Sequence, residues 1–221
     1  MKLFLNALEK YVMGLLFMAV LVFWPAGSLR FWNGWLLIGL LFGPMLILGV
    51  VLFAKAPKLL EKRLSAKEKM ADQQGVVAVS GLMFLGGFVV AGLDHRFGWS
   101  TMPDWVVALA SAVFLISYAL YAEVMRENAY LSRTIKVEEG QTVVDTGLYG
   151  VVRHPMYAVT ILLFLMIPLV LGSWYSLIVF AFYPGIIIIR LKNEEDLLTR
   201  ELPGYPEYKQ KVKFRLIPFI W

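Results

Sequence analysis

Polar side chains that could do chemistry gather in two short stretches on either side of a long apolar run in the C-terminal half. Arg153 and His154 stand before the run, which covers residues 157–189, and Arg190 and Glu194 follow it. Because Arg190 and Glu194 are four residues apart, on one helix they would share a face, as an ion pair or as a cation and an anion facing one ligand. If the run folds back on itself, its two ends meet and these side chains form one candidate site.

The stretch before the run predicts an anion-binding pocket. Pro155 can begin a helix, and the unpaired N–H groups of a first helical turn, together with Arg153 and His154, suit a carboxylate. The alternative, which is the more common role of a lone histidine, is that His154 only caps this helix. No metal site is predicted, because the second histidine, His95, is expected on the opposite face and no His/Asp/Glu spacing fits a closed site.

The stretch after the run also has plainer interpretations. Arg190 follows four isoleucines and can be a boundary arginine that reaches the membrane surface. The pair of Arg190 and Glu194 can be an ordinary surface ion pair, which stabilises a protein little. Both interpretations stay open from the residues alone.

The composition places these residues in a membrane protein. Of 221 residues, 59% are apolar and only 17% are charged, and the mean hydropathy is +0.69, which is too apolar for a soluble domain. The chain has no cysteine, which excludes disulfides, thiolate nucleophiles and cysteine-ligated metals. The net charge of +5 does not indicate nucleic-acid binding, because the basic residues flank apolar runs and form no separate domain.

Charge-free apolar runs predict the membrane spans. Four of them are close to the length that crosses about 30 Å of hydrocarbon as a helix; they cover residues 11–29, 31–54, 76–93 and 105–122. The run at 157–189 would be roughly 50 Å long as one helix at about 1.5 Å per residue. A Leu-Gly-Ser-Trp turn signal near its middle therefore predicts a hairpin of two helices, at about 157–171 and 174–189, kinked by Pro168 and Pro184.

The hairpin also explains the distribution of charge. With it, all 21 basic residues except Arg30 and Arg96 fall on one side of the membrane together with both termini, and the positive-inside rule makes that side cytoplasmic. We expect an all-α polytopic membrane protein with one domain, 1–221, in which residues 1–125 supply the N-terminal spans and 126–221 the site. The first run is not expected to be a cleaved signal, because it is long enough to span and another span follows at once.

Three segments outside the bilayer have recognisable patterns. Residues 55–72 are expected to form an amphipathic helix at the headgroups. Residues 135–144 alternate around a Glu-Gly turn, which predicts a short β-hairpin. The basic segment 203–218, with interleaved aromatic residues, is expected to face lipid and to bind anionic headgroups, and it fits nucleic acid poorly.

The motifs of the C-terminal half resemble those of the isoprenylcysteine carboxyl methyltransferase family of integral membrane enzymes. The resemblance rests on GLYGVVRHPMY at 147–157, EEDLL at 194–198, GYPEY at 204–208 and RLIP at 215–218. The motifs cover roughly residues 126–221. The earlier part of the chain resembles the family only in being made of apolar spans. The order of these motifs around an apolar hairpin makes the resemblance specific.

The resemblance implies S-adenosylmethionine as the cofactor and a lipid-like or prenylated acceptor that is reached among membrane lipids. It implies that Arg190 orients the acceptor carboxylate. Two positions depart from the family pattern: Leu148 replaces the usual proline, and Val159 replaces a small residue, which affects the shape of the loop and the room beside the hairpin. The implied cofactor-binding residues are Thr142, Val143, Val144, Tyr149, Arg153, His154, Pro155, Met156, Tyr157 and Glu194.

Several reactions remain to be distinguished. An ionised carboxylate needs alignment and desolvation but no general base, so a carboxylate acceptor is favoured over a thiol or a phospholipid amine, for which only Glu194, Glu195 and nearby tyrosines offer bases. An NADPH-dependent membrane reductase of the sterol-reductase type is the alternative enzyme, and the short chain and the double glutamate argue against it. A small transporter or scaffold is the non-enzymatic alternative, disfavoured because the predicted spans carry no ionisable residue.

Overall fold

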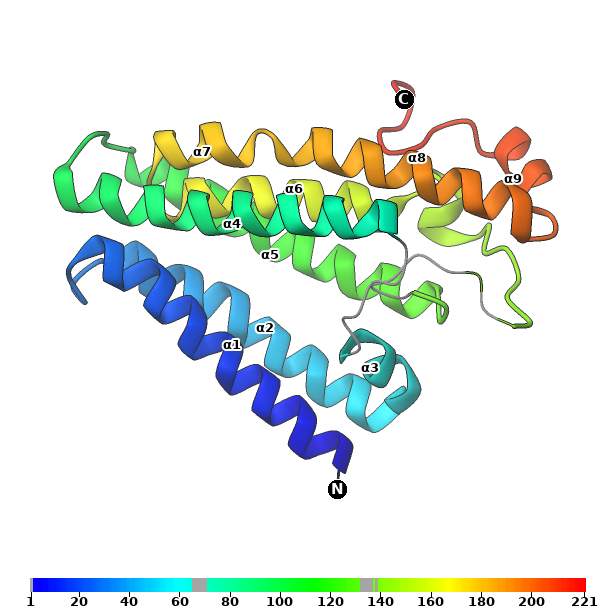
Figure 1. Cartoon of the computed structure of the whole chain (residues 1–221), viewed down its shortest axis with the longest axis horizontal. Helices are drawn as coiled ribbons and strands as arrows, with labels where there is room; N and C mark the ends of the chain where they lie inside the picture. The colour runs from blue at the N-terminus through cyan, green and yellow to red at the C-terminus, as the bar shows by residue number, and fades with distance from the viewer. Residues whose placement is uncertain (1, 65–70, 132–136, 138) are drawn as a thin grey trace.

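A computed structural model of the chain describes the backbone of residues 2–64, 71–131, 137 and 139–221. Within these ranges the regular elements are all helical and no strand is assigned, which confirms the predicted fold class (Figure 1). In chain order they are α1 (Lys2–Ala26), α2 (Trp32–Lys55), α3 (Pro57–Leu64), α4 (Ala71–Phe97), α5 (Asp104–Glu127), the 3-10 helix η1 (Gly147–Gly150), α6 (Pro155–Val170), α7 (Trp174–Phe180), α8 (Tyr183–Glu201) and α9 (Tyr205–Lys211).

The predicted spans are helices that extend beyond their apolar runs. The helices α1, α2 and α5 are long and apolar enough to cross a membrane, as are the stretch Gln74–Phe97 of α4 and the stretch Trp174–Glu201 that α7 and α8 form together. The helix α6 is a shorter apolar helix of 16 residues. Large apolar side chains such as Met13, Trp24 and Ile47 stay exposed on these helices, as expected for surfaces that face lipid.

The helices α6 and α7 form the predicted hairpin. The chain turns at Gly172, whose φ of 74° lies in the left-handed region that favours glycine. Ser173 then caps α7 by accepting a hydrogen bond of 3.0 Å from the backbone N–H of Ser176. The return arm is interrupted between α7 and α8, just before Pro184, whereas α6 continues through Pro168 to its end two residues later.

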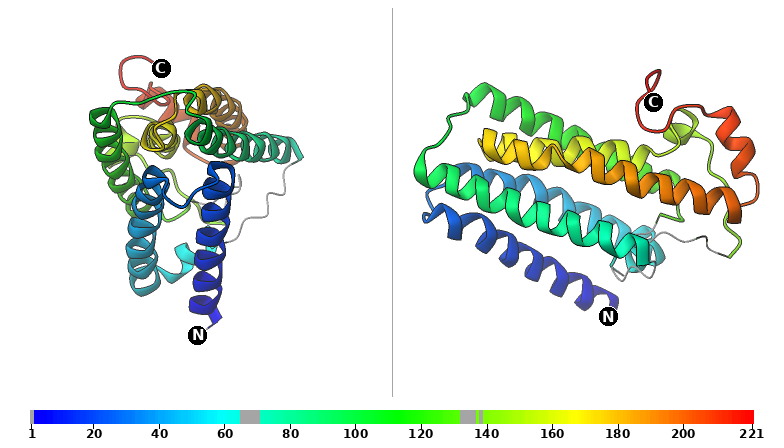
Figure 2. Two further views of the ribbon diagram at one scale, coloured as in Figure 1. Left: turned by 90° about the vertical axis from the view of Figure 1, so that its left-hand side faces the viewer. Right: turned by 45° about the horizontal axis from the view of Figure 1, so that its top comes forward.

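The hairpin lies at the centre of the bundle. Seen along the bundle, α6 lies between α5 and the pair α7 and α8, with α2 beneath it (Figure 2, left). The core that joins these helices includes the fully buried side chains of Leu37, Phe114 and Phe180. Burial of these large apolar groups fixes the direction in which both arms of the hairpin leave the bundle.

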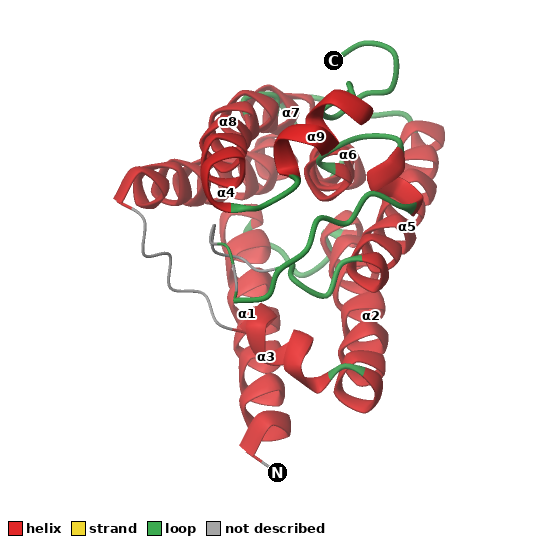
Figure 3. Ribbon diagram, turned by 90° about the vertical axis from the view of Figure 1, so that its right-hand side faces the viewer, coloured by secondary structure: helices red, strands yellow, loops and turns green. Residues whose placement is uncertain are grey.

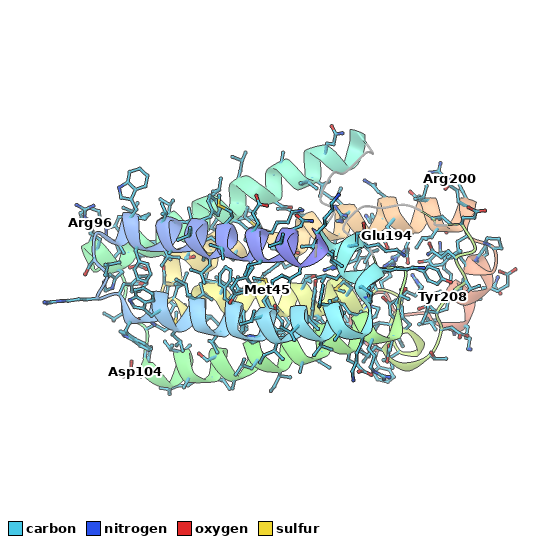
Figure 4. The ribbon with its side chains drawn as sticks, turned by 90° about the horizontal axis from the view of Figure 1, so that it is seen from below. Met45, Arg96, Asp104, Glu194, Arg200 and Tyr208 are labelled. Carbon is cyan, nitrogen blue, oxygen red and sulfur yellow. The ribbon has the colours of Figure 1, made fainter. Side chains whose placement is uncertain are left out.

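The two ends of the bundle carry different segments. At one end, called the site end below, lie the N-terminus, α3, the segment after α5, α9 and the C-terminus (Figure 1). The far end holds the turns that join α1 to α2, α4 to α5 and α6 to α7. Glu194 and Tyr208 lie at the site end, and Arg96 and Asp104 at the far end (Figure 4). The segments predicted to share one side of the membrane therefore share one end of the bundle.

A buried carboxylate, Asp94, lies one residue beyond the predicted charge-free run 76–93. The helix α4 extends past its apolar run, and Asp94 is only 1% exposed within it. Its carboxylate accepts hydrogen bonds from the backbone N–H of Ser100 at 2.7 Å, the hydroxyl of Ser100 at 2.7 Å and the hydroxyl of Ser173 at 2.5 Å. These neutral donors satisfy the buried carboxylate and tie α4 to the next loop and to the cap of α7.

The short segments outside the bilayer agree with prediction in part. Of the predicted amphipathic segment 55–72, residues 57–64 form the helix α3, which buries Leu59 and Leu60 on one face. Residues 65–70 of that segment lie outside the described residues. Of the predicted β-hairpin, the turn forms at Gly140, where φ is 70°, but residues 139–146 form no strand. Residues 135, 136 and 138, in its first arm, lie outside the described residues.

Candidate active site

A cavity at the site end collects the predicted residues. It is formed by α8, the first turn of α6, α9 and the segment between α5 and α6, and Figure 3 looks onto this end. Its empty space is about 880 Å³, counting the part open to solvent. The predicted residues that line it are Thr142, Val143, Val144, Tyr149, Arg153, His154, Met156, Tyr157, Arg190 and Glu194.

Pro155 is the one predicted cofactor residue that does not line this cavity. It is buried as the first residue of α6, where its missing N–H costs no helical hydrogen bond. His154 occupies the cap position of α6, but its side chain makes no capping hydrogen bond. The capping alternative for His154 therefore holds for its backbone position and fails for its imidazole.

Tyr157 joins the two ends of the hairpin inside the cavity. Its hydroxyl donates a hydrogen bond to Glu194 Oε2 and accepts one of 3.2 Å from Arg190 Nε. Arg190 and Glu194 thus share the face of α8 that the four-residue spacing predicts, and both point to the start of α6. The folded hairpin brings these side chains together across more than thirty residues of chain.

Glu195 is a residue of the site whose role the sequence did not reveal. It is 3% exposed, and its Oε1 accepts a hydrogen bond of 2.7 Å from Arg153 Nε and lies 3.2 Å from His154 Nε2. Its Oε2 accepts a hydrogen bond of 2.9 Å from Arg215 Nε. A buried carboxylate is stable when cations and hydrogen bonds surround it in this way. The signal available in sequence was an unexplained excess of cations in the RHP and RLIP motifs.

The anion that Arg153 and His154 were expected to bind is thus supplied by the chain itself. The guanidinium of Arg153 also donates to the carbonyls of Val212 at 2.8 Å and Lys213 at 2.9 Å. Arg153 lines the wall of the cavity, and these donors are directed into the protein. Its contacts are those of a residue that supports the cavity wall.

The segment after α9 holds the RHP motif through its backbone. The backbone N–H of Arg153 donates to the Phe214 carbonyl, and that of His154 donates to the Arg215 carbonyl, both at 2.9 Å. From α9 itself, the Tyr208 hydroxyl donates to the Tyr149 carbonyl at 2.7 Å. The two C-terminal motifs therefore form the outer wall that positions the motif before α6.

The structure gives a physical reason for Leu148, the first departure from the family pattern. The backbone N–H of Leu148 donates to the Glu127 carboxylate at the end of α5, at 2.9 Å to Oε2 and 3.2 Å to Oε1. A proline has no N–H and could not make this bond. Gly147 precedes it with φ of 56°, and a Cβ there would overlap the same carboxylate. The carboxylate thereby fixes the turn that carries Tyr149.

The second departure, Val159, fills space beside the same tyrosine. Val159 is 7% exposed and packs with Val124 of α5 and Tyr149 in one buried cluster. The larger side chain thus contributes to the packing behind the cavity wall, and it is not among the residues that line the cavity.

Buried tyrosines surround the cavity in their neutral form. Burial raises the pKa of Tyr149, although a hydrogen bond with Asn128 opposes the shift. Burial and then the Glu195 charge raise the pKa of Tyr205, and burial raises that of Tyr208. All three phenols line the cavity as hydrogen-bonding groups that stay protonated at neutral pH. Among the described residues, no group of His, Asp or Glu could hold a metal ion.

Comparison with known proteins confirms the predicted family resemblance. Residues 106–200 match the model of the Isoprenylcysteine carboxyl methyltransferase (ICMT) family. The matched segment begins in α5, ends in α8 and includes the RHPMY motif, Arg190 and Glu194. The fold and this segment define the class of protein as a multi-span membrane protein that carries the segment characteristic of this methyltransferase family.

A bacterial relative extends this comparison. The chain is similar to the uncharacterized protein YpbQ of Bacillus subtilis (strain 168), with 27% identity over 96 residues. That stretch is 43% of this chain and 57% of the relative, so the chain matches a little over half of the relative's length.

Proposed function

We propose that the protein is an integral membrane methyltransferase that transfers a methyl group from S-adenosylmethionine to a carboxylate on a lipid-like acceptor, such as an isoprenylcysteine-type α-carboxyl group. The main observation in support is that Arg190, at the end of the apolar hairpin, lines the same cavity as Glu194, Tyr157 and His154. The family match supports methyl transfer. The apolar hairpin beside the cavity supports an acceptor that arrives from the bilayer.

The chemistry of the cavity fits the cofactor. The Glu194 carboxylate and the Tyr157 hydroxyl are acceptors for the ammonium of a methionine end, and Val143, Val144 and Leu198 offer apolar surface to a nucleoside. S-adenosylmethionine supplies a methyl group on a sulfonium, and transfer to a carboxylate oxygen breaks the carbon–sulfur bond, forms an ester bond and moves no proton. The demand on the protein is therefore alignment of the acceptor and exclusion of water.

Arg190 would align the acceptor. Its Nε donates to the Tyr157 hydroxyl, which restrains the plane of the guanidinium. A planar guanidinium binds a carboxylate through two parallel hydrogen bonds, and a lysine ammonium cannot reproduce this geometry. Its place at the end of four isoleucines would let the acceptor's apolar tail remain in the membrane.

The scarcity of bases favours a carboxylate acceptor over an amine or a thiol. An amine or thiol would have to lose a proton, and both oxygens of Glu195 are bonded to cationic side chains. The neutral phenols of Tyr149 and Tyr205 are not bases at neutral pH. Among the described acidic side chains that line the cavity, Glu194 is the remaining candidate for a general base, and its carboxylate already accepts a hydrogen bond from Tyr157.

The sidedness of the protein follows from the same proposal. The site end holds most basic residues, so the positive-inside rule would orient it and both described ends of the chain toward the cytoplasm, where the cofactor is made. Labelling of a single cysteine at Glu207→Cys in intact and permeabilised cells tests this orientation. Labelling only after permeabilisation is expected, and equal labelling in intact cells would contradict it.

The experiment that tests the function is a methyl-transfer assay with purified protein and radiolabelled S-adenosylmethionine. We expect radioactive methyl groups to appear in a lipid-soluble carboxylic thioether, as an ester that base hydrolyses, and none to appear in the matched carboxamide. Label in phospholipid amines or thiols alone would overturn the acceptor class, and stabilisation of the fold by NADPH but not by S-adenosylmethionine would overturn methyl transfer.

Variants of α8 locate the reaction. Arg190→Lys keeps the positive charge but loses the two parallel N–H donors of the guanidinium. It should lower kcat/KM by about 100-fold, because the acceptor is then misplaced. Lys192→Gln, at an exposed position of the same helix, is the matched control and should retain activity. Methyl transfer that survives both His154→Ala and Arg190→Ala would exclude this cavity as the site.

A further inference from the structure

The residues after α9 form a closed loop with an apolar outer surface. The Trp221 carbonyl accepts hydrogen bonds from the backbone N–H groups of Leu216 and Ile217, at 3.0 and 3.1 Å, and the Trp221 N–H donates to the Ile217 carbonyl at 3.1 Å. The Arg215 guanidinium lies 5.0 Å from the centre of the Trp221 ring. The backbone polar groups of the loop thus bond to one another, Leu216 is buried, and the apolar side chains at 217, 219 and 220 are exposed.

The outward side chains of this loop are large and apolar. Ile217, Phe219 and Ile220 are 51%, 89% and 76% exposed. Phe219 adopts φ of 65°, the left-handed region that bulky residues rarely occupy, so the backbone is held in an unfavoured conformation while its ring projects outward. Exposed apolar groups of this size mark a surface that another apolar medium covers.

The position of the loop identifies the bilayer as that medium. The chain after α9 turns back along α8 toward the bundle (Figures 1 and 2). The residues just before the loop pair with Arg153 and His154, at the start of the apolar helix α6. The loop therefore lies at the depth where the apolar part of the hairpin begins, which is the boundary between hydrocarbon and headgroups.

Charge near the loop indicates the kind of lipid. Lys213, just before the loop, is exposed. Lysines beside an apolar surface at this depth are attracted to anionic headgroups.

We propose that the loop at residues 216–221 inserts Phe219 and its apolar neighbours into the interface of an anionic bilayer and anchors the outer wall of the cavity there. Arg215 and Phe214, which hold Glu195 and the RHP motif, belong to the same segment. This inference concerns a membrane contact and does not depend on the reaction at the site.

The absence of native cysteine permits a direct test. An environment-sensitive fluorophore is attached to Phe219→Cys and, as the control, to Glu207→Cys, an exposed position on α9. Each labelled variant is placed in nanodiscs that hold one copy of the full chain. The nanodiscs contain phosphatidylcholine with or without phosphatidylglycerol. We expect emission at shorter wavelength and quenching by lipids brominated high on the acyl chain at position 219 only, both stronger with phosphatidylglycerol.

Two outcomes would overturn the proposal. Emission at 219 that matches the control at 207 would show that water surrounds the loop. Quenching at 219 that is unchanged by phosphatidylglycerol and by Lys213→Gln would refute the anionic preference. Single-copy nanodiscs exclude a second chain as the covering surface, and the readout is independent of methyl transfer.

Discussion

Two buried carboxylates, one at each end of the bundle, are stabilised in different ways. Glu195 at the site end is held by Arg153, His154 and Arg215, whereas Asp94 at the far end is held by two serines. Hydrogen bonds from charged donors are stronger and fix the geometry of their partners more firmly than neutral ones. The difference indicates that the site end uses buried charge to set the shape of a cavity, and the far end uses a carboxylate to join helices.

The largest effect is expected from Glu195→Ala. Removing the carboxylate of the buried Arg153–Glu195 ion pair leaves the Arg153 charge uncompensated and costs about 3–5 kcal/mol. Thermal unfolding in detergent should show a large fall in Tm, with loss of methyl transfer. Glu194→Ala is the matched control at the neighbouring position, which should lose activity with a smaller change in Tm. Equal Tm values for wild type and Glu195→Ala would contradict the assigned role.

A smaller effect at the site end is expected from Leu148→Pro, which introduces the residue that is usual in the family. It removes the N–H that bonds the Glu127 carboxylate, and a hydrogen bond to a charged group contributes about 1.5–3 kcal/mol. Calorimetry should show weaker binding of S-adenosylmethionine. Leu148→Ala keeps the N–H and should bind as wild type does, so equal affinity of the two variants would refute the assigned contact.

At the far end, Asp94→Asn tests the other half of the comparison. The amide retains one oxygen acceptor and loses the second, so the expected cost is about one hydrogen bond, roughly 1 kcal/mol. Tm should fall modestly while kcat and KM of the folded protein stay unchanged. A selective loss of kcat without a change in Tm would show that the far end takes part in function.

The smallest effect is expected from Lys211→Ala at the exposed surface. The hydrogen bond from Lys211 to Asp145, at 2.6 Å, lowers the pKa of Asp145. Removing the lysine should raise that pKa toward its ordinary value in an NMR titration, with no change in Tm or activity, because an exposed ion pair contributes little. A marked fall in Tm would show that exposed and buried charges at this end act as one network.

Prediction succeeded where the chain has a regular period or a fixed spacing. The hairpin at Gly172 followed from the length of one apolar run, and the shared face of Arg190 and Glu194 followed from helical spacing. Prediction failed where a contact joins distant segments. The donors to Asp94 and the partners of Glu195 lie on other elements, and no local pattern assigns them.

The sequence by itself determined the all-helical membrane fold, the hairpin and the gathering of the RHPMY motif with α8, because hydropathy, helical period and bilayer thickness act locally along the chain. The tertiary structure alone decided which glutamate faces the cavity and which one is buried. Glu194 and Glu195 are adjacent, but a helix turns its successive side chains by about 100°. Only the packing of α8 against α6 and the C-terminal segment directs one to Tyr157 and the other to Arg153 and Arg215.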